Sequence, residues 1–547
     1  MKKTREEEIN KKLSTVLLAI VMSVTSLGAF AGCGGSGQKY DETKSQLNVG
    51  VFYGGLGRVW MDSLAKDFEE YYKDTSFEDG KKGVQVVVDA KKKEFEIANL
   101  SVTMESYDNA LYATDFSDIA LWHQNGLLAD ISDTVNEKVY DEDGNLAAAT
   151  GKAAVSSIHD IMYDEFEGYY DYDGKTYALP HRNSVSGIIY DADLFNKNGY
   201  YFFENGSLGA KQSDIDAGRA GKGPDGVAGT ADDGMPVTYS DFQRLLVKMK
   251  SENVIPFTWA QEGALDYQKN FAFESFMANY EGSESYAKNF TSDNYEELAN
   301  QEGRKAGIQF FYDVVKGGYY SSKAERNNFT AAQFEFIDSV NTDNPIAMFM
   351  EGGYWESEAR PAFDAAAVID PDMGYGKRDF RLLPIPNFVG VNGITDQTNT
   401  SEKEVLLGKG QSSAVFITEK NTCQNPELQK KLAKLFLQFM HSREQLSNFT
   451  RDTGACFKTF DYTATKSEVA EYTKFGQNVY RYMSEGAKCV SNISVSKAWK
   501  NNYYTCEKVL SGCSAGIYTN AVSYFLNNPS ATVDDCYAAA QQSIRGL

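Results

Sequence analysis

The chain has 547 residues, which is too long for one hydrophobic core and predicts two or more domains. Its 42% hydrophobic and 24% charged residues are typical of a globular protein and exclude the fibrous and disordered classes. The formal net charge of −22 argues against nucleic acid or an anionic membrane surface as the partner.

The N-terminal segment predicts export from the cell. A basic start precedes the uncharged run 13–32, which is about long enough to span a bilayer, so a membrane anchor is the alternative reading. The small residues Ala31 and Gly32, followed by the glycine-rich stretch after Cys33, favour a cleaved signal peptide over residues 1–32. The tripeptide 31–33 resembles the lipobox of bacterial lipoproteins, which implies that Cys33 is acylated. Residues 33–46 then form a flexible tether.

The first predicted elements of the mature chain make a strand–helix–strand unit. Strands are expected at 47–53 and 83–90, with a helix at 58–72 whose aromatic and apolar residues recur every four positions. The short apolar run 117–122 is expected to be a further strand ending at Trp122. This order predicts an α/β domain with a mainly parallel sheet.

A second organised region begins at 174–195, where strand-like runs lie on either side of Pro180. A helix is expected at 241–254, capped by Thr238, and strands at 255–263, 344–355 and 410–418. Asn425 and Pro426 predict the start of another helix, over 425–442. The last hundred residues are expected to be mostly helical.

In this order, the pieces resemble a known family. The segments 117–132, 174–195, 238–257, 347–359 and 410–440 are similar to those of the extracellular solute-binding proteins of ABC importers, in particular family 1 sugar-binding lipoproteins of Gram-positive bacteria. The resemblance implies the type II periplasmic-binding-protein fold, with two hinged α/β lobes and a ligand cleft between them. Lobe 1 would comprise 47–175 plus 412–450, and lobe 2 would comprise 176–411 plus 451–547.

Several strand ends carry the mixture of aromatic and polar side chains that a sugar needs, because its C–H faces stack on rings while its hydroxyls require hydrogen bonds. Trp355 and Trp122 fall where related sugar binders place stacking aromatics, and they are therefore the leading candidates. The full set of predicted ligand-binding residues is Trp355, Trp122, Tyr354, Glu351, Trp259, Gln261, Tyr53, His181, Asn183 and Ser184.

The glycine-rich loop 221–236 is a candidate calcium site. Asp225, Asp232 and Asp233 lie among glycines that allow tight reversals, and hard oxygen donors suit Ca²⁺. The spacing is not that of an EF-hand, and an acidic surface loop is the alternative. No spacing of histidines and cysteines predicts zinc.

The other six cysteines all lie in the last quarter of the chain, at 423, 456, 489, 506, 513 and 536. Outside the cell they could pair in 15 ways, or they could remain buried thiols, and the sequence does not decide between these states.

The predicted function is capture of a carbohydrate, in particular an oligosaccharide, and its delivery to an ABC transporter permease. The protein would be a lipid-anchored monomer on the outer face of the membrane, with no catalytic residue and no required cofactor. A cell-surface glycan-degrading enzyme is one alternative, because acidic residues are plentiful. A peptide or amino-acid receptor of the same fold is another.

Overall fold

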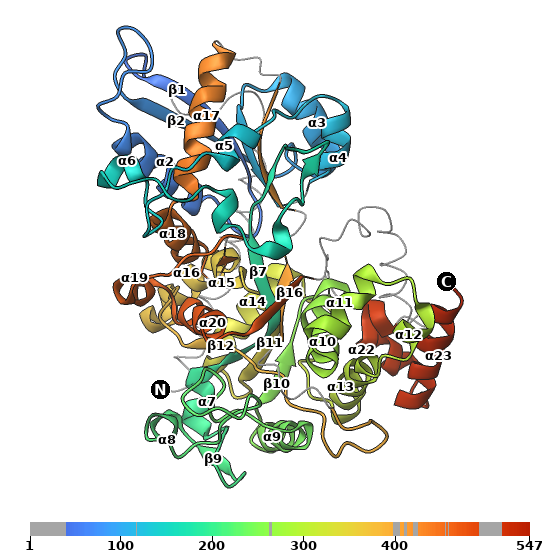
Figure 1. Ribbon diagram of the computed structural model, residues 1–547. Helices are drawn as coiled ribbons and strands as arrows, with labels where there is room; N and C mark the ends of the chain where they lie inside the picture. Colours follow the sequence, from blue (N-terminus) through green and yellow to red (C-terminus); the bar gives the residue numbers. More distant parts are fainter. Residues whose placement is uncertain are drawn as a thin grey trace.

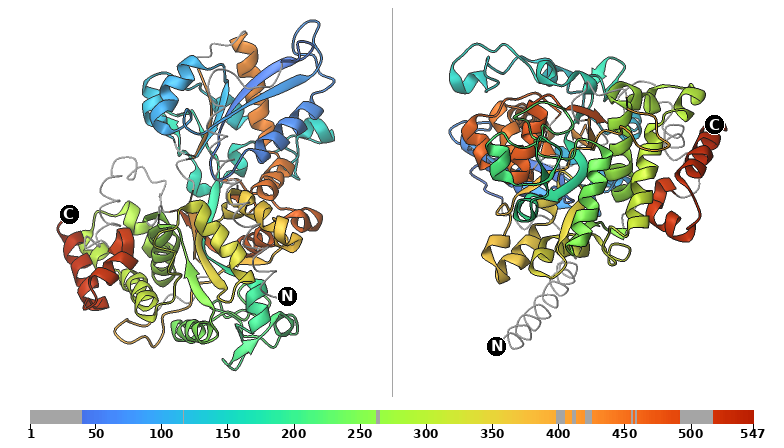
Figure 2. Two further views of the ribbon diagram at one scale, coloured as in Figure 1. Left: turned by 180° about the vertical axis from the view of Figure 1, so that it is seen from behind. Right: turned by 90° about the horizontal axis from the view of Figure 1, so that it is seen from below.

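The computed structural model describes residues 40–115, 117–261, 265–397, 405–409, 413–419, 425–454, 456–457, 459–491 and 517–547. The chain forms two lobes, each built around its own sheet (Figure 1). The view from behind shows the same arrangement, with the C-terminal helices on the outer side of the larger lobe (Figure 2).

Lobe 1 contains a five-stranded sheet in the order β2-β1-β3-β14-β6. Its strands are β1 (Ser45–Phe52), β2 (Val84–Lys91), β3 (Leu111–Thr114), β6 (Leu179–Pro180) and β14 (Ala414–Ile417). β1 runs parallel to β2 and β3, whereas β14 runs antiparallel to both β3 and β6. Successive residues of β14 alternate between two apolar clusters, so both faces of this sheet are covered.

Helices cover the two faces of the lobe 1 sheet. They are α2 (Val59–Tyr71), α3 (Ile97–Ser106), α4 (Ile119–Gln124), α5 (Ser132–Asn136), α6 (Ala147–Thr150), α17 (Pro426–Met440) and α18 (Arg443–Thr453). A small hairpin of β4 (Asp171–Tyr172) and β5 (Lys175–Thr176) lies beside them. α17 buries Leu432, Phe436 and Leu437, which are spaced as one face of a helix requires.

Lobe 2 contains a seven-stranded sheet whose main path is β10-β11-β7-β13-β16. The strands are β7 (Asn183–Asp191), β10 (Ile255–Thr258), β11 (Ile346–Gly352), β12 (Phe380–Leu382), β13 (Val405–Lys409), β15 (Cys456–Phe457) and β16 (Lys488–Ser491). β7 is antiparallel to β11, β12, β13 and β15. Both sheets are therefore mixed, and the expectation of mainly parallel sheets holds only for β2-β1-β3, β10-β11 and β13-β16.

The helices of lobe 2 enclose one large aromatic core. They are α7 (Ala192–Asn198), α8 (Gln212–Asp216), α9 (Tyr239–Ser251), the π-helix η4 (Leu265–Phe273), α10 (Glu274–Glu281), α11 (Ser283–Thr291), α12 (Tyr295–Ala299), α13 (Gly303–Gly317), α14 (Phe329–Asp338), α15 (Trp355–Glu358), α16 (Arg360–Ile369), α19 (Lys466–Glu471), α20 (Lys474–Ser484), α22 (Ile517–Asn527) and α23 (Val533–Arg545). A hairpin of β8 (Tyr201–Phe202) and β9 (Leu208–Ala210) lies at the end remote from lobe 1 (Figure 1).

Three parts of the chain pass between the lobes: from β6 to β7, from β13 to β14, and around β15, which pairs with β7 of lobe 2 although Phe460 packs in the lobe 1 core. The backbone N–H groups of His181 and Arg182 donate to the carbonyl and hydroxyl oxygens of Ser413, at 3.3 and 3.1 Å. The hydroxyl of Thr459 donates to the carbonyl oxygen of Pro180 at 2.8 Å. These bonds hold the three connections side by side, and we call this region the hinge.

The lobe boundaries differ slightly from those expected. β6 places Pro180 in the lobe 1 sheet because the strand pairs with β14. Phe460 belongs to the lobe 1 core, so this lobe continues beyond α18. The chain therefore enters lobe 2, both times, a few residues later than the sequence-based boundaries at 175 and 450.

The run 117–122 leads into helix α4 (Ile119–Gln124) and does not form the expected strand. The side chain of Asp118 accepts a hydrogen bond from the backbone N–H of Leu121, which caps α4. Ile119 and Trp122 are three residues apart and lie together on the buried face. A short apolar run of this length does not distinguish a strand from a helical turn.

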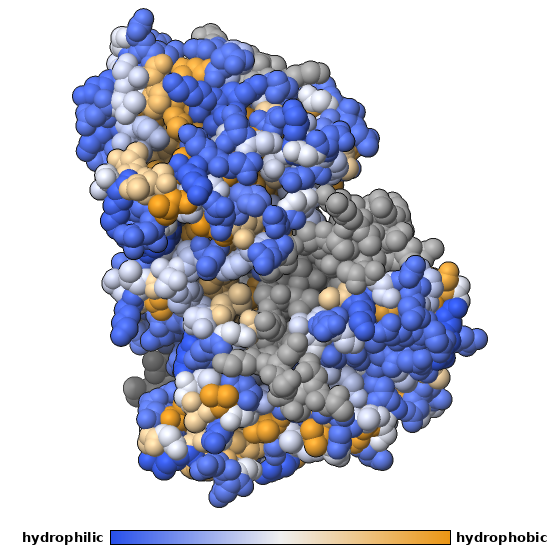
Figure 3. All heavy atoms as spheres, in the orientation of Figure 1, coloured by the Kyte–Doolittle hydropathy of each residue, from blue (hydrophilic) through white to orange (hydrophobic). Residues whose placement is uncertain are grey.

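The outer surface is largely hydrophilic in the view of Figure 3, as the acidic composition leads one to expect. No helix in the described part of the chain is long and apolar enough to cross a membrane. The proposed signal peptide and Cys33 lie outside the described residues.

Candidate functional site

The two lobes touch directly where β1 and β11 end. The Gly54–Gly55 turn after β1 faces α15, and a Cβ atom at Gly55 would lie 3.0 Å from Cδ2 of Tyr354. The hydroxyl of Ser357 donates to the carbonyl oxygen of Leu56 at 3.3 Å. The carboxyl ends of the two strands therefore meet at the boundary between the lobes, which is where α/β proteins place their ligands.

Charged and polar side chains surround this contact. Nε of Arg182, in the hinge, lies 3.4 Å from Oδ1 of Asp115, which follows β3. Both side chains are about nine-tenths buried. Nε2 of Gln333, on α14, donates to Oε2 of Glu358 at 2.9 Å. The guanidinium carbon of Arg182 lies 5.7 Å from the ring centre of Tyr354. We call these five residues the junction cluster.

Burial shapes the electrostatics of the junction cluster. It raises the pKa of the Asp115 carboxyl, and the charge of Arg182 opposes that rise. Burial likewise raises the pKa of Glu358, while the hydrogen bond from Gln333 and the charge of Lys92 lower it. In such a poorly hydrated setting, hydrogen bonds to a ligand are stronger than they are in water.

The junction cluster combines acceptors, donors and an aromatic ring. The carboxylates accept hydrogen bonds, the guanidinium and the amide donate them, and Tyr354 adds an aromatic ring. This combination suits molecules that carry many hydroxyl groups.

The three predicted tryptophans do not face the junction. Trp355, Trp122 and Trp259 are each 0% exposed. The indole of Trp355 lies 4.9 Å from the Phe380 ring and belongs to the lobe 2 core. Trp122 packs on Phe416 in lobe 1. The expectation that these rings form the sugar-stacking surface is therefore wrong, because each one is core packing.

The predicted residues of the hinge lie next to Arg182 along the chain. His181 is 1% exposed, and its ring centre lies 4.9 Å from that of Trp60. Asn183 is buried at the start of β7. Ser184 follows it in β7, with its backbone paired to β13 and β15.

Of the other predicted residues, some lie at the junction and the rest stabilise nearby strand ends and turns. Tyr53 is 51% exposed directly after β1, and Tyr354 is partly exposed within the junction cluster. Glu351 is fully buried, and its carboxylate accepts from the N–H of Gly352 at 2.8 Å. The N–H of Gln261 donates to the carbonyl oxygen of Asn327 at 2.9 Å, which anchors the turn after β10.

Of the junction cluster, the sequence-based candidates omit Asp115, Arg182, Gln333 and Glu358. One local signal identifies Asp115, since it directly follows a buried strand, where ligand-facing loops begin. Gln333 and Glu358 lie inside helices, and no local pattern distinguishes them from other polar helix residues.

The acidic loop 221–236 is held together by its own hydrogen bonds. The carboxylate of Asp232 accepts from the N–H of Asp225 at 3.0 Å and from the hydroxyl of Thr230 at 2.7 Å. Asp233 accepts from the N–H of Gly229 at 2.8 Å. Among the described residues, no group of three or more acidic, histidine or cysteine side chains is arranged to hold a metal ion. Calcium binding by this loop stays a prediction.

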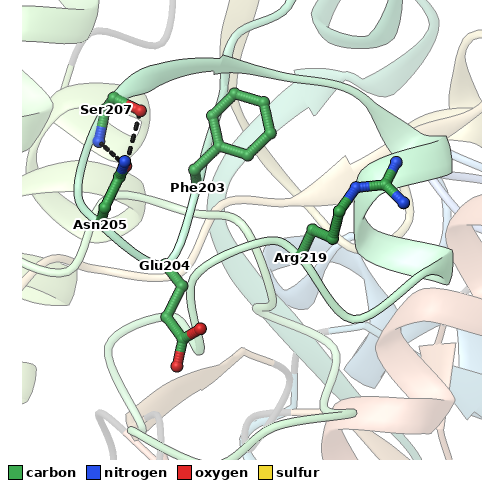
Figure 4. Close-up of a pocket in the computed structure, with 5 residues that line it drawn as sticks. All are labelled: Phe203, Glu204, Asn205, Ser207 and Arg219. Atoms are coloured by element: carbon green, nitrogen blue, oxygen red, sulfur yellow. Dashed lines mark hydrogen bonds between the residues drawn. The ribbon is translucent and has the colours of Figure 1, made fainter.

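A surface hollow at the remote end of lobe 2 is a poorer candidate (Figure 4). It is lined by Phe203, Glu204, Asn205, Ser207 and Arg219. The hydroxyl of Ser207 donates to Asn205, and Arg219 donates to Asp214. These polar groups therefore already have hydrogen-bond partners within lobe 2. Because only one lobe lines this hollow, a ligand in it would not link the two lobes.

The cysteine prediction stays open. Cys536 is a buried thiol, and it is the one free cysteine whose side chain the structure describes. Cys423, Cys506 and Cys513 lie outside the described residues, and the strands β15 and β16 contain Cys456 and Cys489.

No family model matches the sequence, and no curated protein matches it. Solved structures do match. RafE, a solute-binding protein in complex with raffinose, is 13% identical and has a TM-score of 0.52, covering 91% of this chain and 100% of its own. The cyclic α-maltosyl-1,6-maltose binding protein of Arthrobacter globiformis is 12% identical and has a TM-score of 0.52, covering 92% and 98%.

A third similar structure comes from work on xylan utilization by Caldanaerobius polysaccharolyticus. It is 13% identical and has a TM-score of 0.53, covering 91% of this chain and 100% of its own. At such low identity these likenesses establish the fold alone. The chain therefore has the two-lobed α/β fold of these solute-binding proteins.

Proposed function

We propose that the protein is an extracellular receptor that binds a carbohydrate, in particular an oligosaccharide, between its two lobes without cleaving it. The observation that carries the proposal is the junction cluster, in which lobe 1 contributes Asp115, the hinge contributes Arg182 and lobe 2 contributes Glu358. A ligand that bonds all three favours the closed arrangement, because it gains contacts from both lobes only there. The similar structures named for raffinose and for a cyclic maltosyl-maltose support a sugar as the ligand.

A thermal-shift screen of the mature protein tests this function, since a ligand of the folded state raises the melting temperature. The panel contains mono- and oligosaccharides, amino acids and short peptides. We expect only the saccharides to raise Tm. The Kd of each saccharide that does so is then measured by calorimetry. A rise in Tm with amino acids or peptides instead would indicate a peptide or amino-acid receptor.

Two isosteric variants test the location of the site. Asp115→Asn and Glu358→Gln keep the shape but remove one charged acceptor each, and a hydrogen bond to a charged group contributes about 1.5–3 kcal/mol. We expect Kd to rise roughly 10- to 100-fold. Asp133→Asn is the matched control, because the side chain of Asp133 is 71% exposed and forms an ion pair with Lys434. Unchanged affinity in both variants would show that the ligand site lies outside the junction cluster.

The comparison proteins are binding proteins rather than enzymes, which fits a receptor. Asp115 and Glu358 are nevertheless two carboxyl groups at one junction, so hydrolysis is tested directly. The protein is incubated with the saccharides that it binds, and the mixture is analysed by mass spectrometry. We expect the saccharides to be recovered intact, and shorter products would establish a glycan-degrading enzyme.

We also propose that Cys33 carries a lipid and that the receptor delivers its sugar to an ABC transporter permease. The lipobox-like residues 31–33 and the glycine-rich residues after them support the anchor. In cells, the Cys33→Ser variant should appear in the culture medium, whereas the native protein should fractionate with membranes. Loss of sugar uptake in cells expressing the released variant would support delivery at the membrane.

A further inference from the structure

We propose that lobe 1 carries a second aromatic sugar contact, on the hairpin beside α4, which extends the junction so that a chain of several sugar rings is held. This inference rests on the proposed carbohydrate-binding function. The contact is formed by His123, Tyr172 and Tyr177, which we call the hairpin platform. The ring of His123 stacks on Tyr172, with centres 4.8 Å apart and planes inclined by 17°. Its centre is 4.2 Å from that of Tyr177.

The hairpin platform differs from the aromatic core beneath it. All three rings are partly exposed, whereas Tyr169 and Tyr170, one turn away, are buried. The core side of α4 is occupied by Trp122. Three adjoining rings that remain partly exposed form an aromatic patch at the surface, and exposed apolar patches can mark binding sites.

The platform is built on rigid supports. β4 and β5 are joined by Asp173 and Gly174, whose φ angles of 52° and 76° match the tight two-residue turn that suits a hairpin. The hydroxyl of Tyr170 lies 3.0 Å from that of Ser117 and donates to the carbonyl oxygen of Ser413 at 3.2 Å. The hairpin is thereby fixed to both the loop after β3 and the hinge, so little ordering is required when a ligand binds.

The surroundings of the platform suit sugar hydroxyls. Gln124 and Asn125 are exposed at the end of α4, and Asp118 lies close enough to Tyr172 to raise the pKa of that tyrosine further, after the larger effect of burial. Amide and carboxylate groups beside ring faces provide the donors and acceptors that an oligosaccharide requires.

A short segment of the chain links the junction cluster to the platform. Asp115 and Ser117 belong to one loop, and α4 begins immediately after it. From Asp118 to His123 the helix rises by about 8 Å. α4 lies on the side of lobe 1 above α11 of lobe 2 in both the front and back views (Figures 1 and 2). A saccharide leaving the junction along this loop reaches the platform, so a longer chain gains contacts that a short one cannot make.

The test compares chain lengths in a binding assay. Kd is measured by calorimetry for a disaccharide and a hexasaccharide of the same linkage, taken from the maltose, cellobiose and xylobiose series. The double variant Tyr172→Ser/Tyr177→Ser removes two rings. We expect it to weaken hexasaccharide binding about tenfold or more, because two ring contacts are lost. Disaccharide binding should stay unchanged, because a short chain held at the junction does not reach the platform.

Two further variants make the result specific. Tyr172→Phe/Tyr177→Phe keeps the rings and should retain hexasaccharide affinity. Tyr40→Ser removes a tyrosine that is 56% exposed before the opposite, amino end of β1, and it should change nothing. Equal losses for both chain lengths, or no loss for either, would overturn the platform while leaving the proposed function intact. Failure of the native protein to bind any saccharide would overturn both.

Discussion

Gly55 of lobe 1 lies against Tyr354 of lobe 2 so closely that an added Cβ atom would be 3.0 Å from Cδ2 of the ring. The same added Cβ atom would lie 3.4 Å from Oε1 of Glu358, which also belongs to lobe 2. The turn after the first strand therefore limits how near the lobes come to one another, and Gly55 permits the observed distance.

The variant Gly55→Ala tests this limit. Overpacking of a close contact costs about 1–3 kcal/mol, so we expect saccharide affinity to fall roughly tenfold. Small-angle X-ray scattering with saturating saccharide should show a larger radius of gyration than the native complex has. Gly221→Ala is the control, because its Cβ would meet the nearest atom at an ordinary 3.5 Å. A native-like radius and affinity for Gly55→Ala would show that this contact does not limit closure.

Trp355→Ala should destabilise lobe 2. The indole is 0% exposed among Phe336, Phe363 and Phe380, and removing such a ring costs about 3–5 kcal/mol. We expect calorimetry to show a clearly lower Tm, with Val368→Ala, at a site that is 74% exposed, remaining near the native value. A variant with native Tm but no saccharide binding would show that Trp355 contacts the ligand after all.

Glu356 should make the stability of the protein depend on pH. Burial raises its pKa to about 7 despite the hydrogen bond from the hydroxyl of Thr473 and the nearby charge of Arg360, and Asp379 adds to the rise. Between the ordinary value of 4.5 and about 7, the folded protein holds a proton that the unfolded chain has lost. The free energy of unfolding therefore falls as pH rises through this window and is level above it.

Glu356→Gln isolates that effect. We expect the stability of the variant relative to the native protein to increase between pH 5 and pH 8, by up to about 3 kcal/mol. Urea denaturation at several pH values measures the difference, and other titrating groups cancel because both proteins share them. Parallel stability profiles for the two proteins would show that Glu356 does not carry the effect.

Calcium binding by the loop 221–236 is tested by titration. Bound Ca²⁺ should raise Tm by mass action, and Asp232→Asn should abolish the rise because Asp232 is the most buried carboxylate of the three. Asp74→Asn, at a surface site whose side chain is 73% exposed, should respond to Ca²⁺ as the native protein does. If Ca²⁺ leaves the native Tm unchanged, the loop is an acidic surface loop and the prediction is wrong.

The sequence alone determined elements whose signals are local. α9 begins with the reciprocal bonds of Thr238 and Asp241, and α17 begins at Asn425 and Pro426, as their residue types indicate. The alternating and continuous apolar runs identified β1, β2, β11 and β14. The order of these elements also carried the family resemblance that implied the two-lobed fold, which the similar structures confirm.

Only the tertiary structure decided which side chains meet at the junction. Tyr354 and Trp355 are adjacent aromatic residues, yet the first reaches the junction and the second fills the core, because the direction of α15 fixes where each one points. Asp115, Arg182 and Glu358 come from distant segments and meet only when the lobes dock. Periodicity and capping act within a few residues, whereas a site between lobes depends on how separate elements pack against one another.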